Sequence, residues 1–219
     1  MRAAACMTRK SKLPTLIFEK NLWQGGLSCV AGFDEAGRGA LAGPVAVGTV
    51  ILPKDAPHLS KTLACSRDSK RMTPRQRDLC APLIKKMALA WSVAFADSEE
   101  IDELGIVSAT RLAATRALTT LSIFPDYLLT DFRLELPEQD IPQSSLVRGD
   151  SRSLSIASAS ILAKTERDAL MRKLDEQYPG YGLGQNKGYG TQVHRSALMR
   201  LGYSPVHRTS FVIKELRST

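Results

Sequence analysis

The order of hydrophobic patterns along the chain constrains the fold more than any other feature. Residues 28–33 and 45–52 are apolar and rich in β-branched side chains, which predicts two strands. The turn between them, at residues 37–43, is rich in glycine and short, so the strands are expected to pair as a hairpin. Three further strands are predicted at residues 91–96, 127–130 and 145–147.

Helix start and stop signals lie between and after these strands. Thr73 followed by Pro74 is a typical N-cap and first helical residue, and predicts a helix to about residue 90. Ser98 and Ser108 are each expected to begin a helix, the second reaching about residue 121. Two more helices are predicted over 155–177 and 191–201. A hairpin followed by alternating helices and strands indicates an α/β fold with a mixed sheet and a helical C-terminal portion from about residue 155.

The length of 219 residues suits one ordinary domain. We expect a flexible basic tail over residues 1–21 and a single domain over 22–219. The longest apolar stretch is too short and too interrupted to span a membrane. The four cysteines form no CxxC pair, which argues against a zinc knuckle. Cys29 and Cys80 are therefore expected to be small buried side chains in a reducing, cytoplasmic setting.

The positive charge is concentrated near the C-terminus. The formal net charge is +8, and residues 148–219 carry 12 basic against six acidic side chains. A concentrated basic surface attracts polyanions, of which nucleic acid is the commonest large one. A solvated basic face that only aids solubility explains the same charge, so charge alone leaves both interpretations open.

Carboxylates stand at three predicted strand ends. Asp34 and Glu35 follow the run 28–33, Asp131 follows the strand 127–130, and Asp150 comes just after the predicted strand 145–147. Strand ends in α/β sheets often meet at one edge, and clustered carboxylates need cations to neutralise their repulsion. Such a cluster suits magnesium or manganese. The alternatives are an exposed acidic turn at Asp34 and Glu35 and a simple turn at Asp150.

Three glycine- or lysine-containing segments are candidates for substrate contact. Gly37, Arg38 and Gly39 offer backbone groups to a ligand; this segment also resembles a dinucleotide fingerprint, but the following strand pattern argues against that. Ser69 and Lys70 stand in a segment able to contact phosphates, or merely to lead into the next helix. Lys187 and Tyr189 stand among glycines, where an exposed ring can stack on a base or sugar; a core tyrosine is the simpler alternative. His194 and His207 lack zinc-site spacing, and we expect both to be structural.

Taken together, these segments resemble the ribonuclease HII family. The segment Gly32-Phe-Asp-Glu-Ala-Gly-Arg-Gly-Ala-Leu-Ala-Gly-Pro44 resembles its opening signature, and Asp68-Ser-Lys-Arg-Met-Thr73 its second block. The strand to Asp131, the block from Arg148 through Asp168, and the segments 187–191 and 207–211 resemble the remaining blocks in order. Phe132, Thr130 and Ser158 depart from the usual pattern, but no carboxylate is missing.

The resemblance implies a ribonuclease H-like fold and an endonuclease that cuts RNA paired with DNA, including single ribonucleotides embedded in duplex DNA. This implies a role in removing RNA primers and misincorporated ribonucleotides during DNA replication and repair. It also implies that the four acids hold Mg²⁺ or Mn²⁺. Two cations ~4 Å apart activate water and stabilise the leaving oxygen, giving 5′-phosphate and 3′-hydroxyl ends. A non-catalytic nucleic-acid-binding protein remains the alternative. No association motif is evident, so a monomer is expected.

Overall fold

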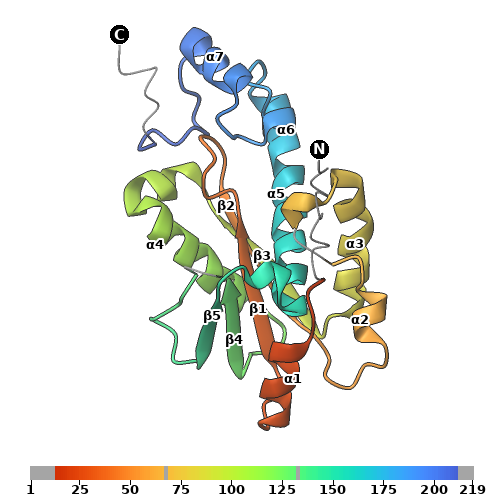
Figure 1. Cartoon of the computed structure of the whole chain (residues 1–219). Helices are drawn as coiled ribbons and strands as arrows, with labels where there is room; N and C mark the ends of the chain where they lie inside the picture. Colours follow the sequence, from red (N-terminus) through yellow and green to blue (C-terminus); the bar gives the residue numbers. More distant parts are fainter. Residues whose placement is uncertain (1–12, 67–68, 132–133, 212–219) are drawn as a thin grey trace, which may run out of the picture.

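The structure is a computed structural model that describes residues 13–66, 69–131 and 134–211. Its centre is a mixed sheet with strand order β3-β2-β1-β4-β5 (Figure 1). The strands are β1 (Val30–Ala36), β2 (Val45–Ile51), β3 (Ala90–Ala96), β4 (Tyr127–Asp131) and β5 (Gln143–Leu146). The predicted hairpin of β1 and β2 is confirmed as an antiparallel pair, and β4 lies parallel to both β1 and β5. The predicted α/β fold with a mixed sheet is therefore correct.

Helices cover both faces of this sheet. Helix α4 (Ser98–Thr119) packs on one face against β2 and β3, and α5 (Leu154–Gln177) packs on the other against β1 and β2, with α3 (Pro74–Met87) outside it (Figure 1). The smaller helices are α1 (Ile17–Gln24), α2 (Leu59–Thr62), α6 (Leu183–Asn186) and α7 (Gln192–Leu201), and short 3₁₀ turns span Ser69–Arg71 and Gly149–Ser151. Among the described residues, no helix is long and apolar enough to cross a membrane.

The approach of α5 to the sheet depends on two strand glycines. A Cβ on Gly32 would lie 2.3 Å from the backbone of Ser155, and one on Gly48 would lie 2.3 Å from the carbonyl oxygen of Ala159. Such distances are too short for any side chain. Because Gly48 is paired with Asp34 across the hairpin, the contact also brings α5 against the acidic end of β1.

Several element boundaries differ from those predicted. β1 continues through Asp34 and Glu35 to Ala36, because these acids keep regular pairing with β2. A helix begins at Ser98 as predicted, with Asp97 as its N-cap, and a second helical segment follows it within α4. The break between the two segments lies at Gly105, where φ is 75°, so the second segment begins before the predicted start at Ser108. Thr73 caps α3 as predicted, but the helix ends at Met87 because Ala90 already pairs in β3.

Regular structure begins closer to the N-terminus than predicted. Helix α1 begins at Ile17, inside the segment 1–21 for which a flexible tail is expected, and Glu19 on this helix is completely buried. Residues 1–12 of that segment lie outside the described residues. The folded part of the chain thus begins before residue 22.

The expectation for the cysteines needs a correction. Cys80 is buried as predicted, but it forms a disulfide with Cys65 rather than remaining a thiol. The end of α2 and the middle of α3 bring the two Cα atoms to 6.0 Å, within the usual range for a disulfide. Cys29 is a free, half-buried thiol.

Candidate active site

The register of the sheet places the first and third acids side by side. Phe33 of β1 pairs with Thr130 of the parallel strand β4, so Asp34 and Asp131 are the next residues of neighbouring strands. Asp34 is only 2% exposed. Its Oδ1 accepts the Glu35 N–H at 2.7 Å, and Ser160 of α5 hydrogen-bonds the same carboxylate.

The fourth acid reaches the same place through the turn after β5. Asp131 Oδ1 accepts the Gly149 N–H at 2.6 Å, which ties the end of β4 to the turn that carries Asp150. Asp150 is itself buried, at 7% exposure. The structure therefore brings together all four acids predicted from the sequence. The alternative interpretation, an acidic turn exposed to water at Asp34 and Glu35, does not apply, because both residues lie in β1 and Asp34 is buried.

Electrostatics show that these carboxylates act on one another. Burial, and then the charges of Glu35, Asp131 and Asp150, raise the pKa of Asp34 well above its ordinary value, although the Ser160 hydrogen bond opposes the shift. Burial also raises the pKa of Glu35, against the opposing charge of Arg38. Burial acts to lower the pKa of Lys70, but the four carboxylates together raise it. The cluster thus holds negative charge that attracts cations.

The donor set fits a hard divalent cation. All four acids offer oxygen, the ligand that magnesium and manganese prefer. Glu35 Oε2 is buried and has no hydrogen-bond partner within the described part of the chain, so it is an acceptor without a donor. Among the described residues, no three His, Cys, Asp or Glu side chains already form a metal-holding group. The fit therefore rests on the chemistry of the carboxylates and on the unpartnered oxygen.

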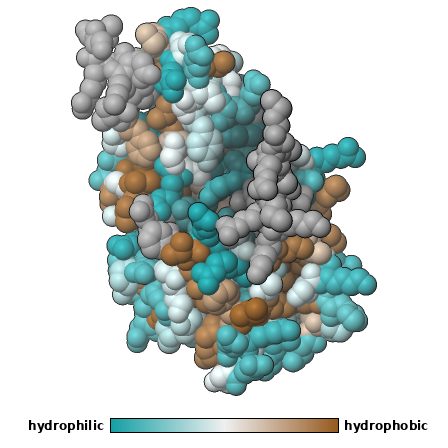
Figure 2. Space-filling view, viewed as in Figure 1, coloured by the Kyte–Doolittle hydropathy of each residue, from teal (hydrophilic) through white to brown (hydrophobic). Residues whose placement is uncertain are grey.

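A pocket of about 180 Å³ opens beside Glu35. Most of the residues predicted to contact substrate line it, together with Lys164 of α5; they are Gly37, Arg38, Gly39, Ser69, Lys70 and Tyr189. Ser69 is linked to the acids, because its Oγ lies 2.8 Å from Ser160 Oγ. Two larger hollows, of about 450 and 350 Å³, have no acidic side chain among their lining residues. Hydrophilic side chains cover much of the molecular face in Figure 2.

Two buried arginines fix the glycine-rich loop that forms one wall of this pocket. Arg167 donates to the carbonyl oxygens of Ala42, Pro44 and Lys187, and Arg208 donates to those of Arg38 and Gly43. Gly37, at φ 91°, has no room for a Cβ, which would lie 1.9 Å from Arg167 Nε. Sequence reasoning did not single out these arginines. Both lie in segments that resemble the family motifs, and this position could have marked them as functional. The sequence around an arginine, however, gives no local sign that its side chain is buried.

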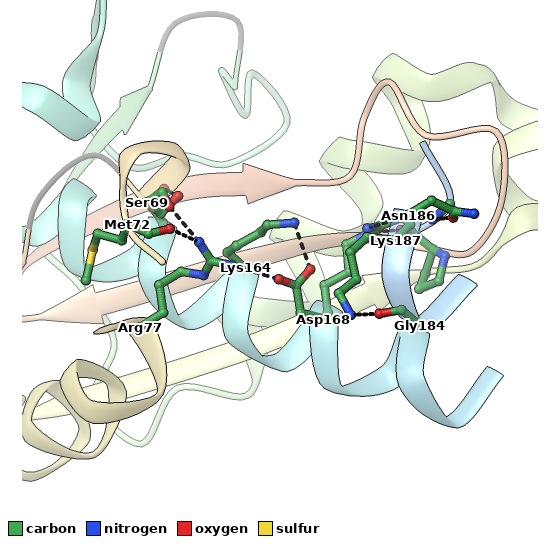
Figure 3. Close-up of polar contacts among 12 residues, drawn as sticks. Ser69, Met72, Arg77, Lys164, Asp168, Gly184, Asn186 and Lys187 are labelled. Atoms are coloured by element: carbon green, nitrogen blue, oxygen red, sulfur yellow. Dashed lines mark hydrogen bonds and ion pairs between the residues drawn. The ribbon is translucent and has the colours of Figure 1, made fainter. Parts of the chain in front are cut away.

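The two lysines near Tyr189 differ from expectation. Lys187 does not line the pocket, because its Nζ donates to the carbonyl oxygen of Gly184 (Figure 3). Lys164, which was not predicted, lines it instead: its Nζ lies 2.7 Å from Asp168 and 5.5 Å from the centre of the Tyr189 ring. Asp168 also pairs with Arg77 at 3.0 Å, so it joins α5 to α3 beside the pocket (Figure 3).

Comparisons with known proteins agree with this arrangement. The sequence profile of the ribonuclease HII family matches residues 31–214. The ribonuclease HII of Dehalococcoides mccartyi is 48% identical over 194 residues, which cover 88% of this chain and 90% of that protein. Ribonuclease HII in its complex with PCNA from Archaeoglobus fulgidus has a similar fold, with a TM-score of 0.71 and 24% identity over 85% of this chain and 96% of that one. Bst-RNase HIII in complex with Mn²⁺ also has a similar fold, with a TM-score of 0.65 and 20% sequence identity over 84% of this chain and 67% of that one.

Proposed function

The chain belongs to the ribonuclease HII family, and from that premise we propose how its acids and its pocket act on substrate. The protein is an endonuclease of the ribonuclease H type, which hydrolyses RNA in RNA–DNA hybrids. The observation that supports a detailed mechanism is the position of the four coupled carboxylates beside a pocket lined by glycine backbone, basic side chains and one tyrosine.

Asp34, Glu35, Asp131 and Asp150 are proposed to hold Mg²⁺ or Mn²⁺. Bound there, such ions activate water and stabilise the leaving oxygen of the phosphodiester. The solved structure of Bst-RNase HIII contains Mn²⁺, which supports the choice of ion. Hydrolysis of this kind leaves 5′-phosphate and 3′-hydroxyl ends.

The chain's own residues position the substrate. Arg38, Lys70 and Lys164 line the pocket and offer positive charge to phosphates. Gly37 and Gly39 line the pocket wall, Gly39 exposed and Gly37 buried, and their peptide groups are proposed to donate to and accept from a 2′-hydroxyl. The Tyr189 ring, 37% exposed, is available to stack on the neighbouring sugar. These contacts suit a single ribonucleotide in DNA as well as a continuous hybrid, and thus a role in removing misincorporated ribonucleotides and RNA primers.

The setting of the enzyme belongs to the same proposal. We place it in the cytoplasm as a monomer, with residues 22–219 as one catalytic domain to which α1 is joined. In a reducing cytoplasm the Cys65–Cys80 pair would exist as two thiols.

One assay tests the proposed function. Purified protein is incubated with an RNA–DNA hybrid, and separately with duplex DNA containing one ribonucleotide, with Mg²⁺, with Mn²⁺ and with EDTA. Metal-dependent cuts with 5′-phosphate ends are expected on both substrates. A protein that retards the hybrid in a gel but never cuts it would favour the non-catalytic alternative instead.

A further inference from the structure

Helix α1 is joined to the part of the chain that carries the fourth acid. The Thr15 N–H donates to the carbonyl oxygen of Arg152 at 3.0 Å, and the Leu154 N–H donates to that of Thr15 at 3.0 Å. The joined segment lies between Asp150 and the first turn of α5, although more than a hundred residues separate it from α1 in the sequence.

Glu19 is the centre of this junction. It is 0% exposed, and its Oε1 accepts three hydrogen bonds, from Ser153 Oγ at 2.6 Å, Ser155 N at 2.9 Å and Ser155 Oγ at 2.7 Å. Ser153 is the N-cap of α5, so the carboxylate also faces the positive end of that helix. The other oxygen, Oε2, is buried and has no partner among the described residues. A buried carboxyl group is costly unless it is hydrogen-bonded, and here only Oε1 has donors among the described residues.

The segment around Asp150 is held from two sides. On one side Gly149 donates to Asp131, and on the other the Ser153 N–H and Arg152 N–H return to the carbonyl oxygen of Gly149 at 2.8 and 2.9 Å. Those turn bonds fix Asp150 only if residues 152–155 are themselves fixed. Glu19 supplies that second anchor, because it binds Ser153 and Ser155 from a different element.

We infer that Glu19 is a positioning residue, which holds Asp150 in register with the other three acids by clamping the start of α5. This rests on the proposed function, since it concerns the site where the acids hold the divalent ion. Side chains that orient the ligands of a metal typically change metal affinity or activity by about 10- to 100-fold when they are removed.

Direct binding of Mn²⁺ tests the inference without relying on turnover. The signal of free Mn²⁺ is followed by electron paramagnetic resonance as protein is added, for the wild type and for Glu19→Ala, Glu19→Gln and Ser155→Ala. Glu19→Ala should weaken Mn²⁺ binding by about 10- to 100-fold. Glu19→Gln keeps an acceptor oxygen and should therefore retain most of the wild-type Mn²⁺ affinity. Ser155→Ala removes one of the three donors, stays testable if Glu19→Ala fails to fold, and should give a smaller loss.

Asp102→Ala is the matched control. Asp102 accepts four hydrogen bonds, from the backbone and hydroxyl groups of Thr209 and Ser210, and lies on α4 rather than beside α5. It should lower thermal stability without changing Mn²⁺ affinity. In steady-state cleavage, Glu19→Ala should lower kcat while leaving KM for the hybrid nearly unchanged.

Two different failures are distinguishable. Wild-type Mn²⁺ binding that Glu19→Ala and Ser155→Ala leave intact, or that Asp102→Ala weakens equally, would overturn the positioning role alone. A wild-type protein that neither binds Mn²⁺ nor cuts the hybrid would overturn the proposed function, and this inference with it.

Discussion

At the scale of single residues, Asp34 shows that the site is built at the expense of stability. Its carboxylate is buried beside three other acids, and the raised pKa means that the folded protein disfavours the ionised form. Above that raised pKa the folded state therefore carries an electrostatic cost that the unfolded chain lacks. Catalytic groups are commonly held in such unfavourable surroundings.

Asp34→Asn should reduce cleavage by orders of magnitude while hybrid binding largely survives, because the basic side chains proposed to contact phosphate remain. In EDTA at pH 7 the variant should be more stable than the wild type, by about 1 kcal/mol, since the repulsion is removed. Urea unfolding measures this. Asp126→Asn is the control, and its effect on stability should have the opposite sign. Hydrogen bonds from the backbone N–H groups of Cys29 and Ser28 lower the pKa of Asp126, so replacing this carboxylate by a neutral amide should destabilise the folded protein. Near-normal turnover by Asp34→Asn would remove Asp34 from the site.

Tyr189 allows a test of how ribose is recognised. A single ribonucleotide in DNA offers one 2′-hydroxyl, whereas neighbouring hydroxyls of a continuous hybrid can partly compensate for a lost contact. Tyr189→Ala should therefore lose more activity on the single ribonucleotide, by about tenfold, since base or sugar stacking contributes about 1–3 kcal/mol. Both substrates are compared at equal length, salt and Mg²⁺. Tyr203→Ala, which removes a similarly exposed ring outside the pocket lining, is the control. Equal losses on both substrates would assign Tyr189 a structural role.

At the scale of elements, a pair of buried histidines connects α7 to the pocket. The Ser204 N–H donates to His207 Nδ1 at 3.0 Å, so the proton of His207 is on Nε2. That proton is donated to His194 Nε2 at 3.1 Å, and His194 Nδ1 in turn donates to the carbonyl oxygen of Tyr189 at 3.0 Å. Only neutral rings satisfy this chain, which confirms both histidines as hydrogen-bonded structural residues.

This arrangement predicts a pH dependence of stability. Burial, and then the electrostatic interaction with the neighbouring His194 ring, lower the pKa of His207 from 6.5 to about 4. Between these values the unfolded chain binds the proton and the folded protein does not, so stability falls as pH decreases from 6.5 to 4, by up to about 3 kcal/mol. Because the raised pKa of Asp34 acts in the opposite direction, the test compares urea unfolding of the wild type and His207→Gln across this range. In His207→Gln the fall in stability that His207 causes between pH 6.5 and 4 should disappear. Replacement of the exposed His58 by Gln should leave that fall unchanged.

At the scale of the whole molecule, the basic C-terminal third gathers on α5 and the segments beyond it. α6 and α7 pack at the end of α5 away from α1 (Figure 1). Among the described basic side chains of α5 and the segments after it, Arg172, Lys173 and Arg200 are exposed. Lys187 and Arg195 instead bind the carbonyl oxygens of Gly184 and Gly190. The exposed three are the better candidates for phosphate contact.

Replacement of Arg172, Lys173 and Arg200 by Gln should flatten the dependence of hybrid affinity on salt. Each phosphate contact contributes about −0.9 to the log–log slope on B-form DNA, and a hybrid should behave comparably. The matched control replaces three exposed basic residues from the first half of the chain, Lys54, Lys61 and Arg75. Fluorescence anisotropy over a range of salt concentrations measures both slopes. Equal slopes in the two triple variants would place the binding surface elsewhere.

The sequence by itself determined the elements and the identity of the acids. Apolar, β-branched runs joined by a glycine-rich turn predicted the hairpin of β1 and β2, and Thr73 with Pro74 predicted the start of α3, because these signals depend on neighbouring residues. The positions of Asp34, Glu35, Asp131 and Asp150 at three strand ends were also visible, since strands that are parallel end at the same edge of a sheet.

Only the tertiary structure decided which distant segments meet. Glu19 became a buried clamp on α5, Arg167 and Arg208 became buried supports of a loop, and Lys164 replaced Lys187 in the pocket. The Cys65–Cys80 disulfide belongs to the same class of contact. Charged and polar side chains look alike in a sequence whether they face water or the interior. Their fate depends on partners supplied by elements far along the chain, and those partners are known only once the helices and strands have packed.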